Sequence, residues 1–216
     1  MQGKTHAVCG GALAVAVLAP VSFPALGSAM AGGMLGALCP DIDCDSSHAY
    51  KGVTKFALYV ALIFGLCYAL DYVYGTALLA ALVNFERGRW TAARIIGLAL
   101  LIAYFIACAL SAHRTLTHSL VGMAVATAAV YLVAPGIWQS FALGYASHLA
   151  LDLLNKQKEQ LLWPLGDGYA LYVCKSDGAM NQVLLFIGII ALVMLIVFSA
   201  PVTALITTIA AKITAL

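Results

Sequence analysis

Charged residues are scarce in this chain of 216 residues: lysine, arginine, aspartate and glutamate together make up 9% of it, whereas 63% is hydrophobic. In soluble globular domains about a quarter of the residues are charged. The formal net charge of +2 is also too small and too scattered for a surface that binds nucleic acid. The composition therefore indicates an integral membrane protein without a nucleic-acid partner.

The cysteines lack the paired CxxC spacing that is typical of zinc ribbons and redox motifs. Cys9, Cys67 and Cys108 stand inside apolar runs, where a free thiol acts as a small hydrophobic side chain. Cys39 and Cys44 flank an acidic motif, and a soft metal bound by this pair is an alternative. No repeat at a fixed period is visible, which excludes solenoid architectures.

Apolar runs alternate with short polar stretches along the chain. The runs expected to form helices cover residues 56–83, 94–110, 120–135, 138–154, 183–199 and 202–216. Residues 7–38 are also apolar, but prolines and glycines interrupt them, which predicts a hairpin of two short segments. We therefore predict an all-α, polytopic membrane helical bundle, with residues 1–216 forming a single transmembrane domain.

The polar stretch 111–119 separates the two clearest spans and carries His113, Arg114 and His118. Ionisable groups at a membrane boundary are costly and are therefore candidates for function. On a continuous helix the two imidazoles, five residues apart, would point about 140° away from each other. A turn between two helices, with Thr117 as N-cap of the second, would let both rings face one pocket.

Three carboxylates follow the predicted hairpin in the segment 39–45. Pro40 is expected to end the preceding helix and to favour an extended conformation before it. Asp41 and Asp43, two residues apart in such a segment, can both reach one metal ion or bridge two. The alternative is a solvated acidic loop, which we expect for Asp45.

His148 and Asp152 stand near the end of the run 138–154. Four residues apart on a helix, both side chains face one spot. An imidazole nitrogen and a carboxylate oxygen so placed suit zinc or manganese. A histidine that bonds to an aspartate for structural reasons is the alternative for this pair taken alone.

Counting membrane crossings tests whether these distant groups can meet. If the hairpin and each later pair of helices leave one face and return to it, all candidate ligands reach that face: His6, Asp41, Asp43, His113, His118, His148 and Asp152. The prediction fails if residues 7–38 cross only once.

Cleavage of the first apolar run as a signal peptide would remove His6, so we expect this run to be retained. Lysine and arginine are more frequent on this face, which predicts that the site is cytoplasmic, where thiols stay reduced.

Four histidines and three aspartates are too many ligands for one tetrahedral ion. We expect two or three divalent metal ions, zinc in preference to manganese. Such ions activate water and clamp the oxygens of a phosphoryl displacement. Arg114 would hold a phosphate or a developing oxyanion, or would only orient its helix at the interface. Asp43, Arg114 and His118 are the candidate catalytic residues.

In their order and spacing the motifs resemble those of bacterial inner-membrane proteins of the YdjM type, a family of membrane-bound metal-dependent hydrolases. The resemblance lies in an early histidine and in Pro-Asp-Ile-Asp, His-Arg-x-x-Thr-His-Ser, Ser-His-x-x-x-Asp and Leu-Leu-Trp-Pro motifs: His6, 40–43, 113–119, 147–152 and 161–164. It implies a metal-dependent hydrolase. A looser similarity to zinc-dependent phospholipase C, a likeness at the level of the fold, favours a phosphoester.

We therefore predict a multi-pass protein of the bacterial cytoplasmic membrane that hydrolyses an ester bond, with a phosphoester of a lipid or other amphiphile as the favoured substrate. Membrane lipids are the expected partners, and the oligomeric state is left open. One alternative is transport or sensing of a divalent cation, for which Asp71 would be a relay in the other half of the membrane. A structural protein with a stabilising metal is another.

Overall fold

The computed structural model describes residues 1–43, 49–75, 77–83, 91–112, 114–176 and 178–214, without the side chains of 43, 49–57 and 81–83. Apart from two isolated β-bridges after the seventh α-helix, the regular structure of these residues is helical. The elements are α1 (Gly3–Leu18), α2 (Phe23–Leu38), the 3₁₀ helix η1 (Cys39–Asp43), α3 (Ala49–Tyr74), α4 (Leu78–Val83), α5 (Ala92–Leu110), α6 (Leu120–Val133), α7 (Trp138–Leu153), α8 (Ala179–Val197) and α9 (Ala200–Thr214). The predicted all-α class is confirmed.

The apolar segment 7–38 forms two helices, as predicted. Helix α1 ends where Ala19 adopts a left-handed backbone conformation, and Pro20 follows it. Helix α2 begins where the side chain of Ser22 accepts a hydrogen bond from the N–H of Ala25, with a proline in its first turn. The chain is therefore divided into two helices by local features of the sequence, namely Pro20 after the end of α1 and the N-cap Ser22 of α2.

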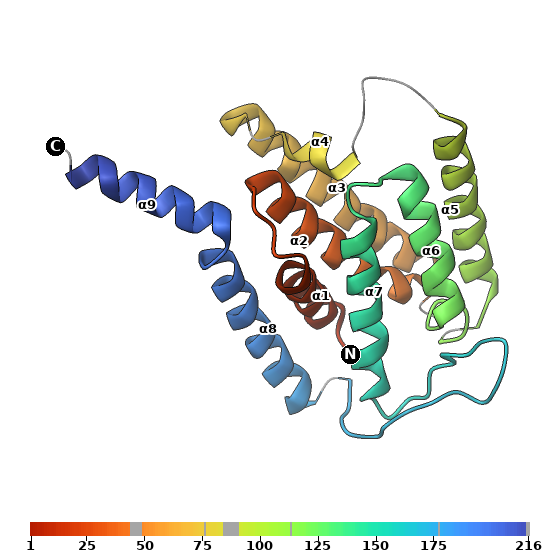
Figure 1. Cartoon of the computed structure of the whole chain (residues 1–216). Helices are drawn as coiled ribbons and strands as arrows, with labels where there is room; N and C mark the ends of the chain where they lie inside the picture. Colours follow the sequence, from red (N-terminus) through yellow and green to blue (C-terminus); the bar gives the residue numbers. More distant parts are fainter. Residues whose placement is uncertain (44–48, 76, 84–90, 113, 177, 215–216) are drawn as a thin grey trace.

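Helices α1, α2 and α7 pack against one another and form the centre of the molecule (Figure 1). Their contact depends on residues without side chains. A Cβ atom on Gly36 would overlap the backbone of Phe141, and one on Gly144 would overlap the carbonyl oxygen of Gly33. Small residues permit close backbone approach in membrane helix bundles, where apolar burial alone gives little drive for association.

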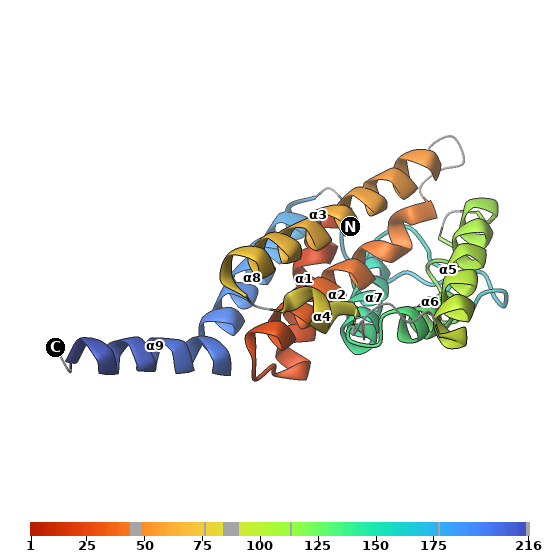
Figure 2. The same cartoon turned by 90° about the horizontal axis from the view of Figure 1, so that it is seen from above.

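The remaining helices surround this centre. Helix α5 pairs with α6, α8 packs on α1, and α9 projects away from the body in both views (Figures 1 and 2). Three segments are long and apolar enough to cross a membrane: Phe23–Ile42, Ala92–Leu110 and Ala179–Val197. The first is 67% buried, but the other two are only 17% and 11% buried, so their apolar side chains face outward, as lipid-facing helices require.

Helix α3 differs from the predicted run 56–83 at both ends. It already begins at Ala49 and ends at Tyr74, and the separate helix α4 follows, so the run is not one helix as predicted. The carboxylate of Asp71 accepts hydrogen bonds from the first N–H groups of α4, so this residue caps a helix.

Two local predictions near the site are also wrong. Pro40 does not follow an extended residue: Cys39 has φ −60° and ψ −42°, and the acidic motif continues as the 3₁₀ helix η1. The N-cap of α6 is Ser119, whose side chain accepts from the N–H of Gly122 at 2.9 Å, and not Thr117. Serine is preferred over threonine at this position, so the residue type agrees with the observed cap.

Gly144→Ala is expected to destabilise the protein, because the new methyl group would collide with the backbone of α2. Such overpacking costs about 1–3 kcal/mol. Thermal unfolding in detergent measures this loss. The matched control is Gly65→Ala on α3, where a Cβ atom meets nothing within 4 Å, and where alanine should be neutral or slightly stabilising. Equal unfolding temperatures for the two variants would contradict the packing described here.

Candidate metal centre

The predicted ligands that the structure describes gather at one end of the bundle. They come from the start of α1, from η1, from the turn before α6 and from the last turns of α7: His6, Asp41, His118, His148 and Asp152. In Figure 1 the N-terminus lies beside α7, near the polar segment that follows that helix. Segments that are far apart in the sequence therefore deliver imidazoles and carboxylates to one place.

His148 stands at the centre of this cluster. Its Nδ1 donates to the carbonyl oxygen of Ala37 at 2.7 Å, so the neutral ring has a bare lone pair on Nε2. Nε2 lies 3.3 Å from Nε2 of His118, 3.7 Å from Oδ1 of Asp41 and 3.9 Å from Oδ2 of Asp152. Electron-rich atoms that converge in this way require a cation or a proton between them.

Asp152 is the most highly connected carboxylate of the cluster and is only 1% exposed. Its Oδ1 lies 3.1 Å from Nε2 of His6 and also receives the amino group of Met1. Its Oδ2 lies 3.7 Å from Nε2 of His118 and accepts from Nη2 of Arg114 at 2.8 Å. The two oxygens thus face different histidines.

His6 tests whether these residues fit a metal. Its ring is fully buried and stacks on that of His148, with centroids 3.8 Å apart and an interplanar angle of 22°. Its Nδ1 has no hydrogen-bond partner among the described residues, and Nε2 has only Oδ1 of Asp152 beside it, at 3.1 Å. Buried polar atoms are normally paired, and zinc and manganese take imidazole and carboxylate ligands. The donor set therefore fits a divalent ion.

Two groups of three side chains could each hold an ion: His6, Asp41 and His148, and His118, His148 and Asp152. Within each group the ligand atoms lie within 4.8 Å of one another. Because the backbone of α2 engages Nδ1 of His148, only its Nε2 can bind an ion. Asp152 belongs to the second group, and its Oδ1 also lies 3.1 Å from Nε2 of His6 in the first.

Arg114 borders the cluster with a side chain that is 12% exposed. Besides Asp152, its guanidinium donates to the carbonyl oxygen of Gln157 at 3.2 Å. Its backbone has φ +63°, a left-handed conformation that costs non-glycine residues about 1–3 kcal/mol and that occurs often at functional sites. The strained turn keeps the guanidinium at Asp152.

A series of hydrogen bonds next to His118 was not predicted from the sequence. The Thr117 hydroxyl lies 2.9 Å from Nδ1 of His118, Tyr145 donates to the carbonyl oxygen of Thr117, and the hydroxyls of Tyr104 and Tyr145 are 2.7 Å apart. All four side chains are buried. Groups of this kind orient metal-binding imidazoles. The sequence feature that could have predicted this role is the position of Tyr145 three residues before His148 on α7, which places both side chains on one face of the helix.

Glu159 was also missed as a member of the site. It is fully buried in the polar segment after α7, where the sequence shows only a run of ordinary charged residues. Its pKa is raised to about 8, first by burial and then by the charge of Asp152, while Arg114 and the amino group of Met1 act in the opposite direction.

Several other candidates lie elsewhere or outside the described residues. The side chain of Asp43 and all of His113, Cys44, Asp45 and His48 are outside the description. Cys39 is buried in the hydrophobic core and belongs to neither ligand group.

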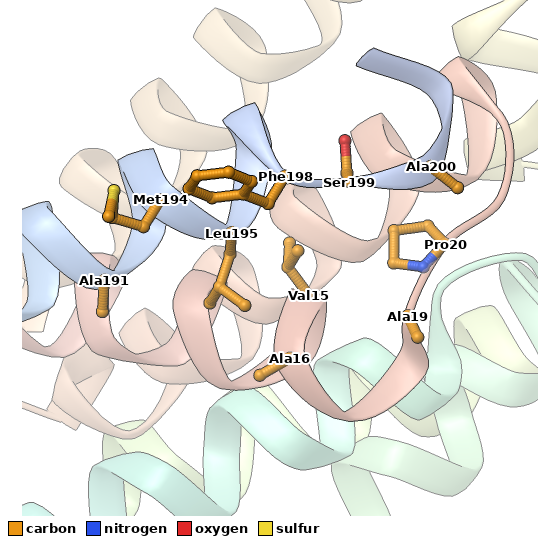
Figure 3. Close-up of a pocket in the computed structure, with 10 residues that line it drawn as sticks. All are labelled: Val15, Ala16, Ala19, Pro20, Ala191, Met194, Leu195, Phe198, Ser199 and Ala200. Carbon is orange, nitrogen blue, oxygen red and sulfur yellow. The ribbon is translucent and has the colours of Figure 1, made fainter. Parts of the chain in front are cut away.

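A cavity of about 550 Å³ lies away from the cluster, between the end of α1 and the corner where α8 meets α9 (Figure 3). Val15, Leu195 and Phe198 are among the side chains that line it, and none of its lining residues is ionisable. Val15 is nine residues from His6, which is about 14 Å along a helix. The cavity is therefore separate from the metal-type ligands.

The family model described as YdjM inner membrane protein matches residues 1–215. The chain belongs to the YdjM inner membrane protein family. This membership and the three candidate spans identify a multi-pass protein of the inner membrane. No curated protein and no solved structure matches the chain.

Asp152→Asn in this YdjM-family protein is expected to reduce bound metal, because the amide cannot neutralise or bridge cations. After loading with zinc, elemental analysis should find about two ions per chain in the wild type and at least one fewer in the variant. Asp167→Asn, an exposed acid in the segment after α7, is the control and should keep all of its metal. Full metal content in the Asp152 variant would contradict the site.

Tyr145→Phe is expected to weaken zinc binding about 10- to 100-fold, because the turn that carries His118 loses its anchor. Competition with a chelator measures the affinity. Tyr131→Phe removes an exposed hydroxyl on α6 and should change nothing. If both variants bind zinc equally well, the chain of hydroxyls does not orient His118.

Proposed function

We propose that this protein is a membrane-embedded metal-dependent hydrolase that cleaves a phosphoester of a lipid or other amphiphile with metal-activated water. The observation that carries the proposal is the convergence on Nε2 of His148 of an imidazole nitrogen and two carboxylate oxygens in a buried place. Such a cluster concentrates negative charge and lone pairs, as the sites of hydrolytic metal ions do.

The residues divide into two ligand sets. His6, Asp41 and His148 would hold one ion, and His118 with Asp152 would hold another, with zinc favoured over manganese. When bound, such ions lower the pKa of a water molecule and offset the charge of a phosphate. The fixed tautomer of His148, set by the carbonyl oxygen of Ala37, presents Nε2 to an ion without rearrangement.

Arg114 is the residue that suits a phosphate. A guanidinium carries five N–H donors in a planar fork, so it can hold Asp152 and approach a phosphate oxygen at the same time. With Asp41, which is 28% exposed, Arg114 is a partly exposed member of an otherwise buried cluster. Substrate would therefore approach at these two residues.

The membrane supports a lipid or another amphiphile as substrate. Helices α5 and α8 expose most of their apolar side chains, and the ligands lie at one end of the bundle, where a span would meet the interface. A substrate with an apolar tail can enter such a site sideways from the leaflet. The excess of lysine and arginine in the segments at this end favours the cytoplasmic face.

Transport or sensing of a divalent cation is the alternative use of the same cluster. A pathway needs polar groups in both halves of the membrane. Asp71, the candidate relay, instead binds the first N–H groups of α4. The described metal-type groups gather at one end of the bundle, which favours hydrolysis.

Arg114→Lys is expected to lower kcat/KM for phosphoesters about 10- to 100-fold while leaving the metal content unchanged, because lysine keeps the charge but loses the planar fork. Hydrolysis of phosphatidic acid, phospholipids and model phosphodiesters by the zinc-loaded protein measures the effect. Arg94→Lys, at the other end of α5, should retain activity. A metal-loaded wild type that cleaves none of these esters would contradict the proposed function and favour transport.

A further inference from the structure

Glu159 is a fully buried carboxyl group that neither ligand set uses. It is 0% exposed, and neither of its side-chain oxygens has a hydrogen-bond partner among the described residues. Its backbone is fixed: N–H and C=O bond with Tyr169 at 2.9 and 2.8 Å, and the N–H of Gln160 donates to the carbonyl oxygen of Arg114 at 3.0 Å. A rigidly held, unpaired buried acid calls for an explanation.

The charges around Glu159 belong to the candidate metal centre. Asp152 on α7 disfavours its ionised form, whereas Arg114 and the amino group of Met1 favour it. Burial of both carboxyl oxygens, without a hydrogen-bond partner among the described residues, outweighs these two cations and raises the pKa of Glu159 to about 8. Glu159 thus holds a proton at neutral pH and can release it.

The other groups of the centre are poorly suited to donate a proton. Imidazoles and carboxylates that bind a metal do so in their deprotonated form. Arginine side chains are not deprotonated in proteins, so Arg114 is unsuitable as a proton donor. Among the described acids at this centre, Glu159 belongs to neither ligand set. It therefore remains available as a proton donor.

We propose that Glu159 is the general acid of the hydrolysis and that the site is therefore built for esters of alkyl alcohols, as in lipids. This inference rests on the proposed function. An alkoxide leaves with difficulty unless it is protonated, whereas a nitrophenolate leaves without help.

The oxygen of water forms a bond to phosphorus, the bond from phosphorus to the alkyl oxygen breaks, and its electron pair stays on that oxygen. The proton of Glu159 passes to this oxygen, directly or through one water molecule, and the alcohol departs. The proton lost by the attacking water restores the Glu159 acid, so one ester and one water yield one alcohol and one phosphate acid.

The test compares Glu159→Gln with the wild type on two substrates, a phospholipid and bis(4-nitrophenyl) phosphate. We expect kcat for the phospholipid to fall about 10²- to 10⁴-fold and the rate for the nitrophenyl ester to change less than about tenfold. Glu159→Asp, which keeps an acid, should recover part of the phospholipid activity. Asp167→Asn removes an exposed acid from the same segment and should match the wild type.

Two further measurements do not depend on turnover. Zinc content should be the same in Glu159→Gln and in the wild type, and the infrared difference between them at neutral pH should contain the C=O band of a protonated carboxyl group. A loss of zinc would make Glu159 a ligand, and a missing band would show it to be ionised; either result overturns the proposal.

The kinetic outcomes separate the two proposals. Wild-type hydrolysis with equal losses on both esters in Glu159→Gln would contradict the role of Glu159 and leave the hydrolase proposal standing. A zinc-loaded wild type that cleaves neither ester would contradict the hydrolase proposal and, with it, this role.

Discussion

The buried negative charge of Asp152 is the constraint on which the arrangement of the site depends. A carboxylate that is almost completely removed from water must be neutralised by its neighbours, and removal of one partner of a buried pair leaves an uncompensated charge. Here the partners are the start of α1, through His6, and the turn before α6, through Arg114 and His118. The carboxylate therefore ties the end of α7 to two distant segments of the chain.

Close helix packing makes this convergence possible. Because Gly36 and Gly144 let the backbones of α2 and α7 touch, the last turn of α2 comes within hydrogen-bond distance of His148. The carbonyl groups in the last turn of a helix lack intrahelical partners, and the carbonyl of Ala37 uses this freedom to accept from Nδ1. The packing of small residues thus determines which nitrogen of His148 faces the metal-type ligands.

The sequence was sufficient to predict the hairpin, the helix that pairs His148 with Asp152, and the meeting of distant ligands at one end. These follow from apolar run lengths, helical periodicity and proline positions, which are local features. Ser119 and not Thr117 is the N-cap of α6, which agrees with the stronger capping preference of serine, so the residue type alone could have predicted it. The burial of Glu159 was not predictable, since a charged residue in a polar segment ordinarily faces water.

The segment after α7 bonds both to the end of α7 and to the turn before α6, the two elements that carry His118, His148 and Asp152. The N–H groups of Leu171, Val173 and Cys174 bond to the carbonyl oxygens of Leu153 and Leu154, so the segment folds back on the end of α7. Exclusion of water strengthens the electrostatic interactions inside.

The burial of the imidazoles has a consequence for access. Because His6, His118 and His148 are 0% exposed while Asp41 and Arg114 reach the surface, a ligand meets the carboxylate and the guanidinium before it meets the imidazoles. An anionic headgroup would be selected by Arg114 at this entrance, while its apolar tail would remain among the exposed side chains of the surrounding helices. If the protein is the hydrolase proposed above, this arrangement would favour substrates that are anionic at one end and apolar at the other.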